Sequence, residues 1–332
     1  MRIEAIMRAL ADPTRLRIMR LLSAMELAVG EMAQVLGQSQ PRVSRHVGIL
    51  CDAGLAERHR EGSWVFLRAA IGRERGSAVG EAVARLLALA EREDPEFAAA
   101  CKDDLRNLAI IRAARENSAQ AYFARHAEDW DELRKLHSPD QQVEERLAFA
   151  LGEATLGQLL DVGTGTGRMA ELFADRAERI VALDKSLDML RVARAKLQNL
   201  PADVVELVQG DFAALPFAAH TFDTVLLHQV LHFAQEPSIA LTEVARVTRP
   251  GGRIAIVDFA AHEHEELRER YAHARLGFTD GAIETLLTEA GYDPAAPIAL
   301  EGGELVVKIW LGTRKGRPES ADTTSTGRKA AQ

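Results

Sequence analysis

The segment best suited to chemistry contains a glycine-rich turn, LLDVGTGTGRMAEL, at positions 159–172. An apolar strand leads into Gly163, Gly165 and Gly167 and then into a helix. Glycines at such a turn let a nucleotide-like ligand approach bare backbone at a helix N-terminus. Read as Gly165-x-Gly167-x-x-Ala170, the turn is also compatible with a dinucleotide site, and glycine turns without any function exist.

Polar residues follow later apolar strands in a consistent pattern. RIVALD ends in Asp184, about twenty residues past the glycines, where a carboxylate can accept hydrogen bonds from both ribose hydroxyls. VVELVQGD ends in Asp211, which Phe212 follows, and FDTVLLHQVLHF carries His228 and His232 at its end. Because ligands gather at the carboxyl ends of strands in open α/β sheets, these residues are predicted to share one site.

In order and spacing, these segments resemble a class I S-adenosylmethionine (SAM)-dependent methyltransferase domain over residues 140–313. A dinucleotide enzyme would not be expected to carry the Gly-Asp at 210–211 or the Pro-Gly-Gly at 250–252. The resemblance implies a Rossmann-like α/β fold, with a seven-stranded, mostly parallel sheet that ends in an antiparallel C-terminal strand.

The resemblance also implies how SAM, or its product S-adenosylhomocysteine (SAH), would be bound. Asp161 would face the methionine amino group, directly or through water, and the glycines would admit the ligand backbone. Asp184 would bind the ribose, while Asp211 and Phe212 would contact the adenine amino group and ring. The implied cofactor-binding set is Asp161, Gly163, Gly165, Gly167, Asp184, Asp211, Phe212 and His228.

The methyl acceptor is not identified by the sequence. Methyl transfer needs an aligned nucleophile about 3 Å away, and a base only when the acceptor carries a proton. His228 and His232 are the candidate catalytic bases. The chain has no Asn-Pro-Pro-Tyr-like stretch for amino groups of adenine or glutamine, and no cysteine after Cys101 for thiolate chemistry on cytosine or arsenic. The scattered histidines beyond residue 260 are not predicted to bind a metal.

A second polar set lies near the N-terminus. SQPRVSRHVGILCDAGL predicts a helix with Val43, Val47 and Leu50 on its buried face. The stretch around Glu61-Gly62-Ser63 alternates and predicts a β-hairpin. Polar residues at the front of such a helix can read base edges, and arginines on the hairpin can hold phosphates. The predicted DNA-binding residues are Gln40, Arg42, Ser44, Arg45, His46, Arg58 and Arg60.

With DPTRLRIMRLL ahead of it, this arrangement resembles the winged helix-turn-helix of the ArsR/SmtB family of bacterial transcriptional regulators, over residues 1–92. The resemblance implies binding of double-stranded operator DNA as a homodimer, through the first helix and a helix at 77–91. The apolar stripe of that second helix could equally face its own domain core, and a winged helix could serve protein contacts alone. Positions 27–29 and 77–91 lack the cysteine or histidine ligands of metal-sensing members, so no metal is expected.

Charge and composition fit two domains of different character. Residues 1–80 carry 12 arginines and 8 acidic residues, a net charge of +4, so the remainder of the chain of net charge −8 holds −12. A basic first domain suits a polyanionic partner. Two cysteines, no apolar run long enough to span a membrane and charges near the start predict a cytoplasmic protein. Residues 93–139 are predicted to form a helical connector, and residues 314–332 a disordered tail.

Two functions remain open at this point. The first is a DNA-binding transcriptional regulator that senses SAM or SAH, which is favoured by the absent metal ligands, the fused SAM fold and the stiff connector. The alternative is an active small-molecule SAM-dependent methyltransferase whose winged helix tethers or regulates it. The two functions are mutually compatible.

Overall fold

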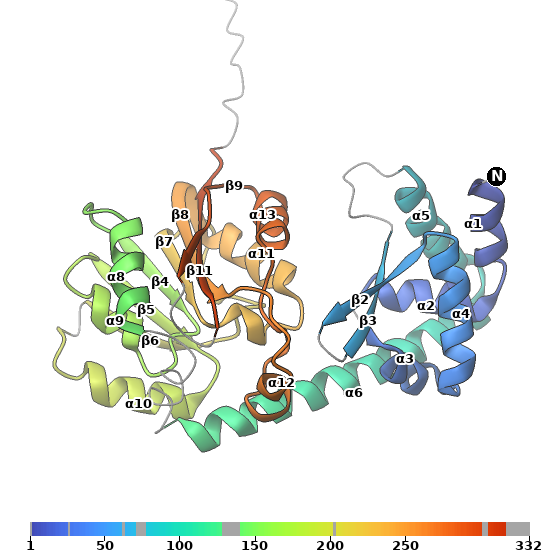
Figure 1. Cartoon of the computed structure of the whole chain (residues 1–332), viewed down its shortest axis with the longest axis horizontal. Helices are drawn as coiled ribbons and strands as arrows, with labels where there is room; N and C mark the ends of the chain where they lie inside the picture. The colour runs from blue at the N-terminus through green and yellow to red at the C-terminus, as the bar shows by residue number, and fades with distance from the viewer. Residues whose placement is uncertain are drawn as a thin grey trace, which may run out of the picture.

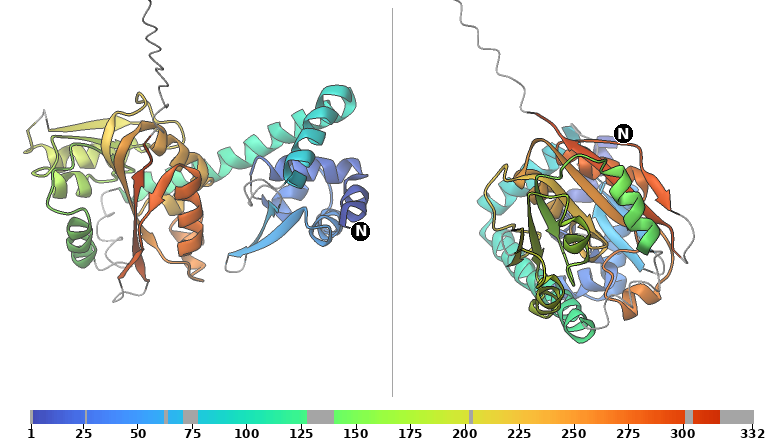
Figure 2. Two further views of the ribbon diagram at one scale, coloured as in Figure 1. Left: turned by 90° about the horizontal axis from the view of Figure 1, so that it is seen from above. Right: turned by 90° about the vertical axis from the view of Figure 1, so that its left-hand side faces the viewer.

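A computed structural model describes residues 2–25, 27–61, 64–70, 78–127, 140–201, 204–300 and 305–316. Figure 1 shows a helical N-terminal body with a small sheet and a larger α/β body. The long helix α6 (Pro95–His126) runs from one body to the other, as the left view of Figure 2 also shows.

The N-terminal body is a winged helix-turn-helix. The hairpin predicted around residue 62 is confirmed as β2 and β3, and the short β1 pairs with β3 to give the order β1-β3-β2. Its elements are α1 (Arg2–Leu10), α2 (Pro13–Leu22), β1 (Leu27–Ala28), α3 (Val29–Leu36), α4 (Gln40–Asp52), β2 (Ala56–Glu61), β3 (Trp64–Ala69) and α5 (Ala78–Glu93).

Local sequence signals set the helix-turn-helix. Asp12 caps α2 by accepting a hydrogen bond from the Arg15 backbone N–H at 3.0 Å. Gly37 ends α3 with a φ of 64°, which glycine adopts without strain. Helix α4 then buries Val43, Val47 and Leu50 completely, as predicted.

Helix α5 divides its apolar residues between two faces. Val83 and Leu87 lie in the core of the winged helix, so part of the predicted stripe serves its own domain. Leu86 and Leu89 are 39% and 46% exposed, and Met7 of α1 is 62% exposed. Residue 77, where this helix was predicted to begin, lies outside the described residues.

Helix α6 lies within residues 93–139, the stretch predicted as a helical connector, and its first half belongs to the winged-helix core. Phe97, Cys101 and Leu108 are buried there. Asp104 accepts two hydrogen bonds from the Arg17 guanidinium, at 2.6 and 2.5 Å, and the Asn107 amide donates to the Val35 carbonyl at 3.0 Å. The far half of α6 packs against α10 (Leu187–Leu197) of the α/β body. The described helix ends at residue 126, and residues 128–139 lie outside the description.

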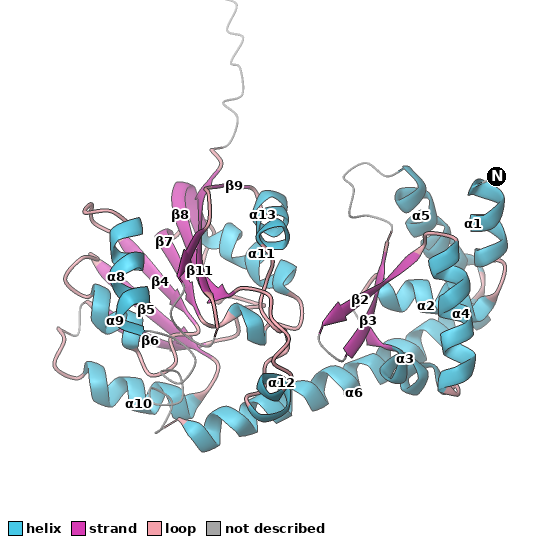
Figure 3. Cartoon of the chain, viewed as in Figure 1, coloured by secondary structure: helices cyan, strands magenta, loops and turns pink. Residues whose placement is uncertain are grey.

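The α/β body has the predicted Rossmann-like sheet (Figure 3). Strands β8-β7-β4-β5-β6 are parallel, and β11 is antiparallel to β8. The described sheet has eight strands where seven were expected, because short β9 and β10 also pair with β11. Its strands are β4 (Gln158–Val162), β5 (Arg179–Asp184), β6 (Val205–Gln209), β7 (Phe222–His228), β8 (Thr248–Phe259), β9 (Tyr292–Pro294), β10 (Ile298–Leu300) and β11 (Val307–Arg314).

Helices pack on both faces of the sheet, and a ligand can reach the carboxyl ends of its strands. The helices are α8 (Asp140–Ala150), α9 (Arg168–Phe173), α10, η1 (Leu231–Phe233), α11 (Pro237–Val247), α12 (Glu266–Arg270) and α13 (Asp280–Glu289). Apolar cores lie on both faces, which explains the near-continuous apolar run of β4. Strand order reverses between β4 and β7, so a crevice opens at their carboxyl ends, where ligands bind in such folds.

Candidate functional site

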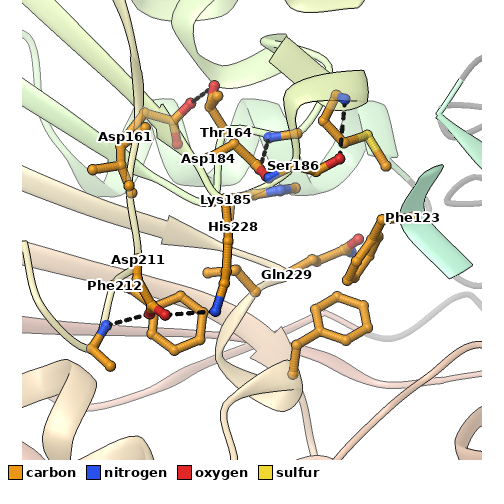
Figure 4. Close-up of a pocket in the computed structure, with 18 of the residues that line it drawn as sticks. Phe123, Asp161, Thr164, Asp184, Lys185, Ser186, Asp211, Phe212, His228 and Gln229 are labelled. Carbon is orange, nitrogen blue, oxygen red and sulfur yellow. Dashed lines mark hydrogen bonds and ion pairs between the residues drawn. The ribbon is translucent and has the colours of Figure 1, made fainter. Parts of the chain in front are cut away.

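A cavity of about 330 Å³ lies at the carboxyl ends of β4, β5, β6 and β7 (Figure 4). Every residue of the predicted cofactor-binding set lines it except Gly167. The strand-end residues of the predicted set therefore meet at one cavity. The roles of the individual residues stay predictions.

The glycine turn closes tightly over the first strand. Gly163 has a φ of 69°, and a Cβ there would lie 2.2 Å from Cγ2 of Val230. Gly167 has a φ of 85°, and its Cβ would lie 2.8 Å from Cδ1 of Leu197. Any larger residue would be both strained and crowded. Asp161, at the end of β4, accepts a hydrogen bond of 2.6 Å from the Thr164 hydroxyl, which orients its carboxylate.

Asp184 is held by backbone N–H groups from two loops. Its Oδ2 accepts from Gly165 at 2.8 Å and its Oδ1 from Ser186 at 2.8 Å. Burial raises the pKa of this carboxyl group, while the backbone hydrogen bonds act to lower it. The backbone N–H of Lys185 also interacts with this carboxylate. A carboxylate has about four acceptor sites, so the fixed group can still accept from a ligand hydroxyl.

Asp211 is already paired on both oxygens. Lys185 contacts its Oδ2 at 2.7 Å, and the Ala213 N–H donates to its Oδ1 at 2.8 Å. An amino group that binds Asp211 must therefore share the carboxylate with Lys185 or displace it. The sequence reasoning missed this lysine, although it directly follows the predicted ribose-binding residue.

The two candidate bases occupy different environments. His228 is 8% exposed and lines the cavity. His232 is 2% exposed and is not among the lining residues. Its Nδ1 lies 2.7 Å from Oδ1 of the fully buried Asp258, and its ring stacks on His273 at 4.1 Å. The structure thus separates the pair: His228 faces the ligand space, and His232 forms a buried histidine–carboxylate pair behind it.

One wall of the cavity comes from α6. Phe123 lines it and meets the ring of Phe233 edge to face, with centroids 4.8 Å apart. Residues 93–139 were predicted as a helical connector, and the structure shows that its helix α6 also reaches the ligand space. Phe233 and Gln229 also line the cavity. They were not predicted, because the sequence shows only that they follow a strand.

The predicted DNA-binding residues gather at α4 and the hairpin. Gln40, Arg42 and Arg45 are exposed, and Ser44 is half-buried. His46 instead turns inward, with its Nδ1 3.7 Å from Oδ1 of Asp12. Arg58 of β2 is exposed, and the side chain of Arg60 lies outside the description.

Metal sites and membrane spans are both absent from the part of the chain that the structure describes. These residues contain no group of three or more histidine, cysteine or acidic side chains placed to hold a metal ion. None of the described helices combines the length and apolarity needed to cross a membrane.

Comparison with known proteins matches each body separately. Residues 160–256 match the methyltransferase domain family model, and residues 12–58 match the model of the bacterial regulatory protein arsR family. The demethylmenaquinone methyltransferase of Renibacterium salmoninarum is 32% identical over 46% of this chain and 60% of its own length. The ubiquinone/menaquinone biosynthesis C-methyltransferase UbiE of Syntrophotalea carbinolica is 38% identical over 51% of this chain and 76% of its own.

A solved SAM-dependent methyltransferase from Aquifex aeolicus is 21% identical, with a TM-score of 0.45, over 55% of this chain and 97% of its own. The chain spans less than two thirds of the first curated relatives, as the 60% coverage of the Renibacterium protein shows. Neither the Renibacterium nor the Syntrophotalea protein matches the whole of this chain.

Proposed function

The chain belongs to the class I SAM-dependent methyltransferases and carries an ArsR-family domain at its N-terminus, and from this premise we propose that it is a transcriptional regulator whose affinity for operator DNA depends on bound SAM or SAH. One observation carries the proposal. The helix that completes the winged-helix core also supplies a wall of the ligand cavity.

Helix α6 is firmly attached at its first end. The hydrogen-bonded ion pair of Arg17 with Asp104 and the burial of Leu108 fix it to the winged helix. At its other end, Phe123 packs on Phe233 beside the ligand space. A ligand that packs on Phe123 therefore contacts the helix on which the winged-helix body is built.

A second contact joins the two bodies close to the same point. The hairpin β2–β3 projects toward the α/β body, and the Arg268 guanidinium of α12 lies over the Phe66 ring of β3, 5.4 Å from its centroid. Arg268 also donates to the Ala274 carbonyl at 2.6 Å, and the Ala274 N–H donates to the His232 carbonyl at 3.0 Å. His232 precedes Phe233, so both connections reach η1.

The proposal has a thermodynamic requirement. A ligand shifts DNA binding only by its differential affinity for the two arrangements, typically about 1–3 kcal/mol, and operator DNA must change ligand affinity by the same factor. We expect SAH, as the product that accumulates when methyl turnover stalls, to release DNA. Binding to DNA would place the protein in the cytoplasm.

The test is a titration of labelled operator, selected from random duplexes, with protein at saturating SAM, saturating SAH and neither. The curves should differ by about five- to 150-fold in the wild type. In Phe123→Ala they should converge at saturating ligand, whereas Ile110→Ala, an exposed position on the same helix, should keep the difference. Three superimposable wild-type curves would reject the sensor.

We further propose that operator binding uses a homodimer. Ile3 and Met7 of α1 and Leu86 and Leu89 of α5 are exposed apolar residues on the two helices through which the ArsR resemblance implies dimerisation. Met7→Glu combined with Leu89→Glu should halve the mass in sedimentation. The same mass in both proteins would place the interface elsewhere.

A second candidate is methyl transfer to a small molecule. It is supported by the relatives named as quinone methyltransferases and by His228, which lines the cavity and can serve as a base. Incubation with methyl-labelled SAM and a panel of small acceptors, including a quinol headgroup, followed by mass spectrometry, tests it. A labelled product that disappears in His228→Asn would establish the activity, and SAM left intact with every acceptor would reject it.

A further inference from the structure

The cavity extends past the residues predicted to hold SAM. Its further lining includes Phe123, Gln229, Phe233 and Ile239, none of which belongs to the predicted cofactor-binding set. Three of these side chains are apolar and one is a carboxamide. Gln235 and Glu236 also line the cavity. Apolar walls with a few polar groups that fix orientation are the make-up of a small-molecule subsite.

Gln229 has two features that need an explanation. Its φ is 51°, in the left-handed region that non-glycine residues rarely adopt, and its N–H donates to the Val257 carbonyl at 2.7 Å, which holds it there. The residue is 7% exposed, yet its Nε2 has no hydrogen-bond partner among the described residues. Strain and an unmet buried donor persist where a ligand site uses them.

The charges around the cavity restrict the ligand. Two cations occur among its described lining residues, and both are in ion pairs: Lys185 with Asp211 at 2.7 Å, and Arg168 with Glu144 at 2.6 Å. An anionic ligand would have to break one of these pairs. A cationic ligand would find carboxylates elsewhere in the lining, such as Asp161 and Glu236, but it offers no acceptor and would leave the Nε2 donor of Gln229 unmet. An uncharged ligand with an acceptor oxygen satisfies the amide without either penalty.

We propose that Gln229 anchors a second ligand beside SAM or SAH: a small uncharged aromatic molecule that bears a hydroxyl or carbonyl oxygen. The oxygen accepts a hydrogen bond from Nε2, and the ring packs on Phe123 and Phe233. The inference rests on the proposed SAM or SAH binding at the adjoining part of the cavity. Because Phe123 belongs to α6, this second ligand touches the helix that joins the two bodies, whether it is a methyl acceptor or a co-effector.

Three benzene derivatives of similar size test the proposal: phenol, benzoate and benzylamine. Each is titrated into the SAH complex and into the ligand-free protein, with binding followed by ligand-detected NMR. We expect phenol to bind at least tenfold more tightly than the two charged probes. Gln229→Met should weaken phenol binding about three- to tenfold, as expected for one hydrogen bond, with SAH affinity unchanged.

Two further variants define the contact. Gln229→Glu keeps the size of the side chain and removes the donor, but its carboxylate could accept from the phenol hydroxyl. It is therefore titrated with acetophenone, whose carbonyl oxygen only accepts, and it should lose acetophenone affinity as Gln229→Met does. Gln141→Met, at an exposed glutamine of α8 that bonds to Glu145, should match the wild type. Equal phenol affinity in the wild type and Gln229→Met, or tighter binding of benzoate or benzylamine, would overturn the proposal. If SAH fails to bind, the proposed sensor fails, and the titrations of ligand-free protein still decide the role of Gln229.

Discussion

At the scale of single residues, the site combines acidic groups whose environments differ. Asp184 is desolvated and held by backbone N–H groups, whereas Asp211 is half-exposed and paired with Lys185. Because burial raises the pKa of Asp184, its charge is maintained less easily than that of an ordinary aspartate. The ribose contact proposed for Asp184 is therefore expected to weaken in acid.

The first prediction concerns Asp184. A protonated carboxyl group offers hydroxyl donors fewer acceptor sites, so SAM affinity should fall as pH is lowered through the raised pKa and stay constant above it. Asp184→Asn should bind SAM about tenfold or more weakly at neutral pH and show little pH dependence. Calorimetry checks this, with Asp175→Asn, an exposed aspartate, as the control. An unchanged dissociation constant would move the ribose contact elsewhere.

The second prediction concerns His262, whose pKa is lowered to about 4, first by burial and then by His264 and His232. Its pKa in the unfolded chain is about 6.5. Between these two pKa values the folded protein therefore binds fewer protons than the unfolded chain. The stability that His262 contributes is present above the unfolded pKa and is lost as the pH falls toward 4.

In His262→Leu, the free energy of unfolding should depend less on pH in this window, by up to ~1.4 kcal/mol per pH unit. Urea unfolding at several pH values measures it, and His126→Gln, on α6, should keep the wild-type slope. Parallel profiles of the wild type and His262→Leu would exclude His262 as the source.

Side-chain direction limited what the sequence could predict at this scale. Each strand-end residue of the cofactor-binding set lines the cavity, because parallel strands bring their carboxyl ends to one edge. His232 was expected there too, but the 3₁₀ turn η1 rotates it onto Asp258 instead. That partner lies 26 residues further along the chain. Gln229 was missed because only the folded backbone shows its positive φ and its unmet amide.

At the scale of elements, arginines lie at two places in the winged helix, on α4 and on the hairpin. Arg42 and Arg45 lie near the front of α4, where side chains reach base edges in helix-turn-helix proteins, while Arg58 lies on the wing. The apolar period of α4 predicted its buried face correctly, since that period depends only on local spacing. It did not predict that His46 turns toward Asp12, which belongs to another helix.

The third prediction separates these two roles. Arg45→Ala should cost about 1–3 kcal/mol on the selected operator and less on unrelated DNA. Arg58→Ala should weaken all sequences alike and reduce the salt slope by about one unit. Fluorescence anisotropy at several salt concentrations measures both, with Arg92→Ala, outside the DNA-binding elements, as the control. Equal losses on specific and unrelated DNA for Arg45→Ala would contradict base reading.

At the scale of the whole molecule, α6 decides how the two bodies depend on each other. Its 32 residues span about 48 Å at the rise of an α-helix. Composition predicted a helical connector without glycine. It did not show that Phe97, Cys101 and Leu108 complete the winged-helix core, because their partners lie far away in sequence.

The fourth prediction follows from that shared helix. A fragment of residues 1–92 lacks the buried side chains of α6 and the Arg17–Asp104 pair, and each buried apolar side chain contributes about 1.5–3 kcal/mol. Since whole domains are stable by only about 5–15 kcal/mol, this fragment should be largely unfolded. A fragment of residues 1–113 should fold. Urea unfolding followed by circular dichroism compares them, and equal midpoints would show that α6 is dispensable for the winged helix.

The same helix sets an order of events during synthesis. Domains fold as units while the chain emerges from the ribosome, at about 5–20 residues per second. The DNA-binding body cannot close until Leu108 has emerged, and Phe123 then waits for Phe233, more than a hundred residues later. For several seconds the nascent chain therefore holds a finished winged helix whose far helical end still lacks its partner. Under the proposed function, DNA recognition in that interval would precede any control by ligand.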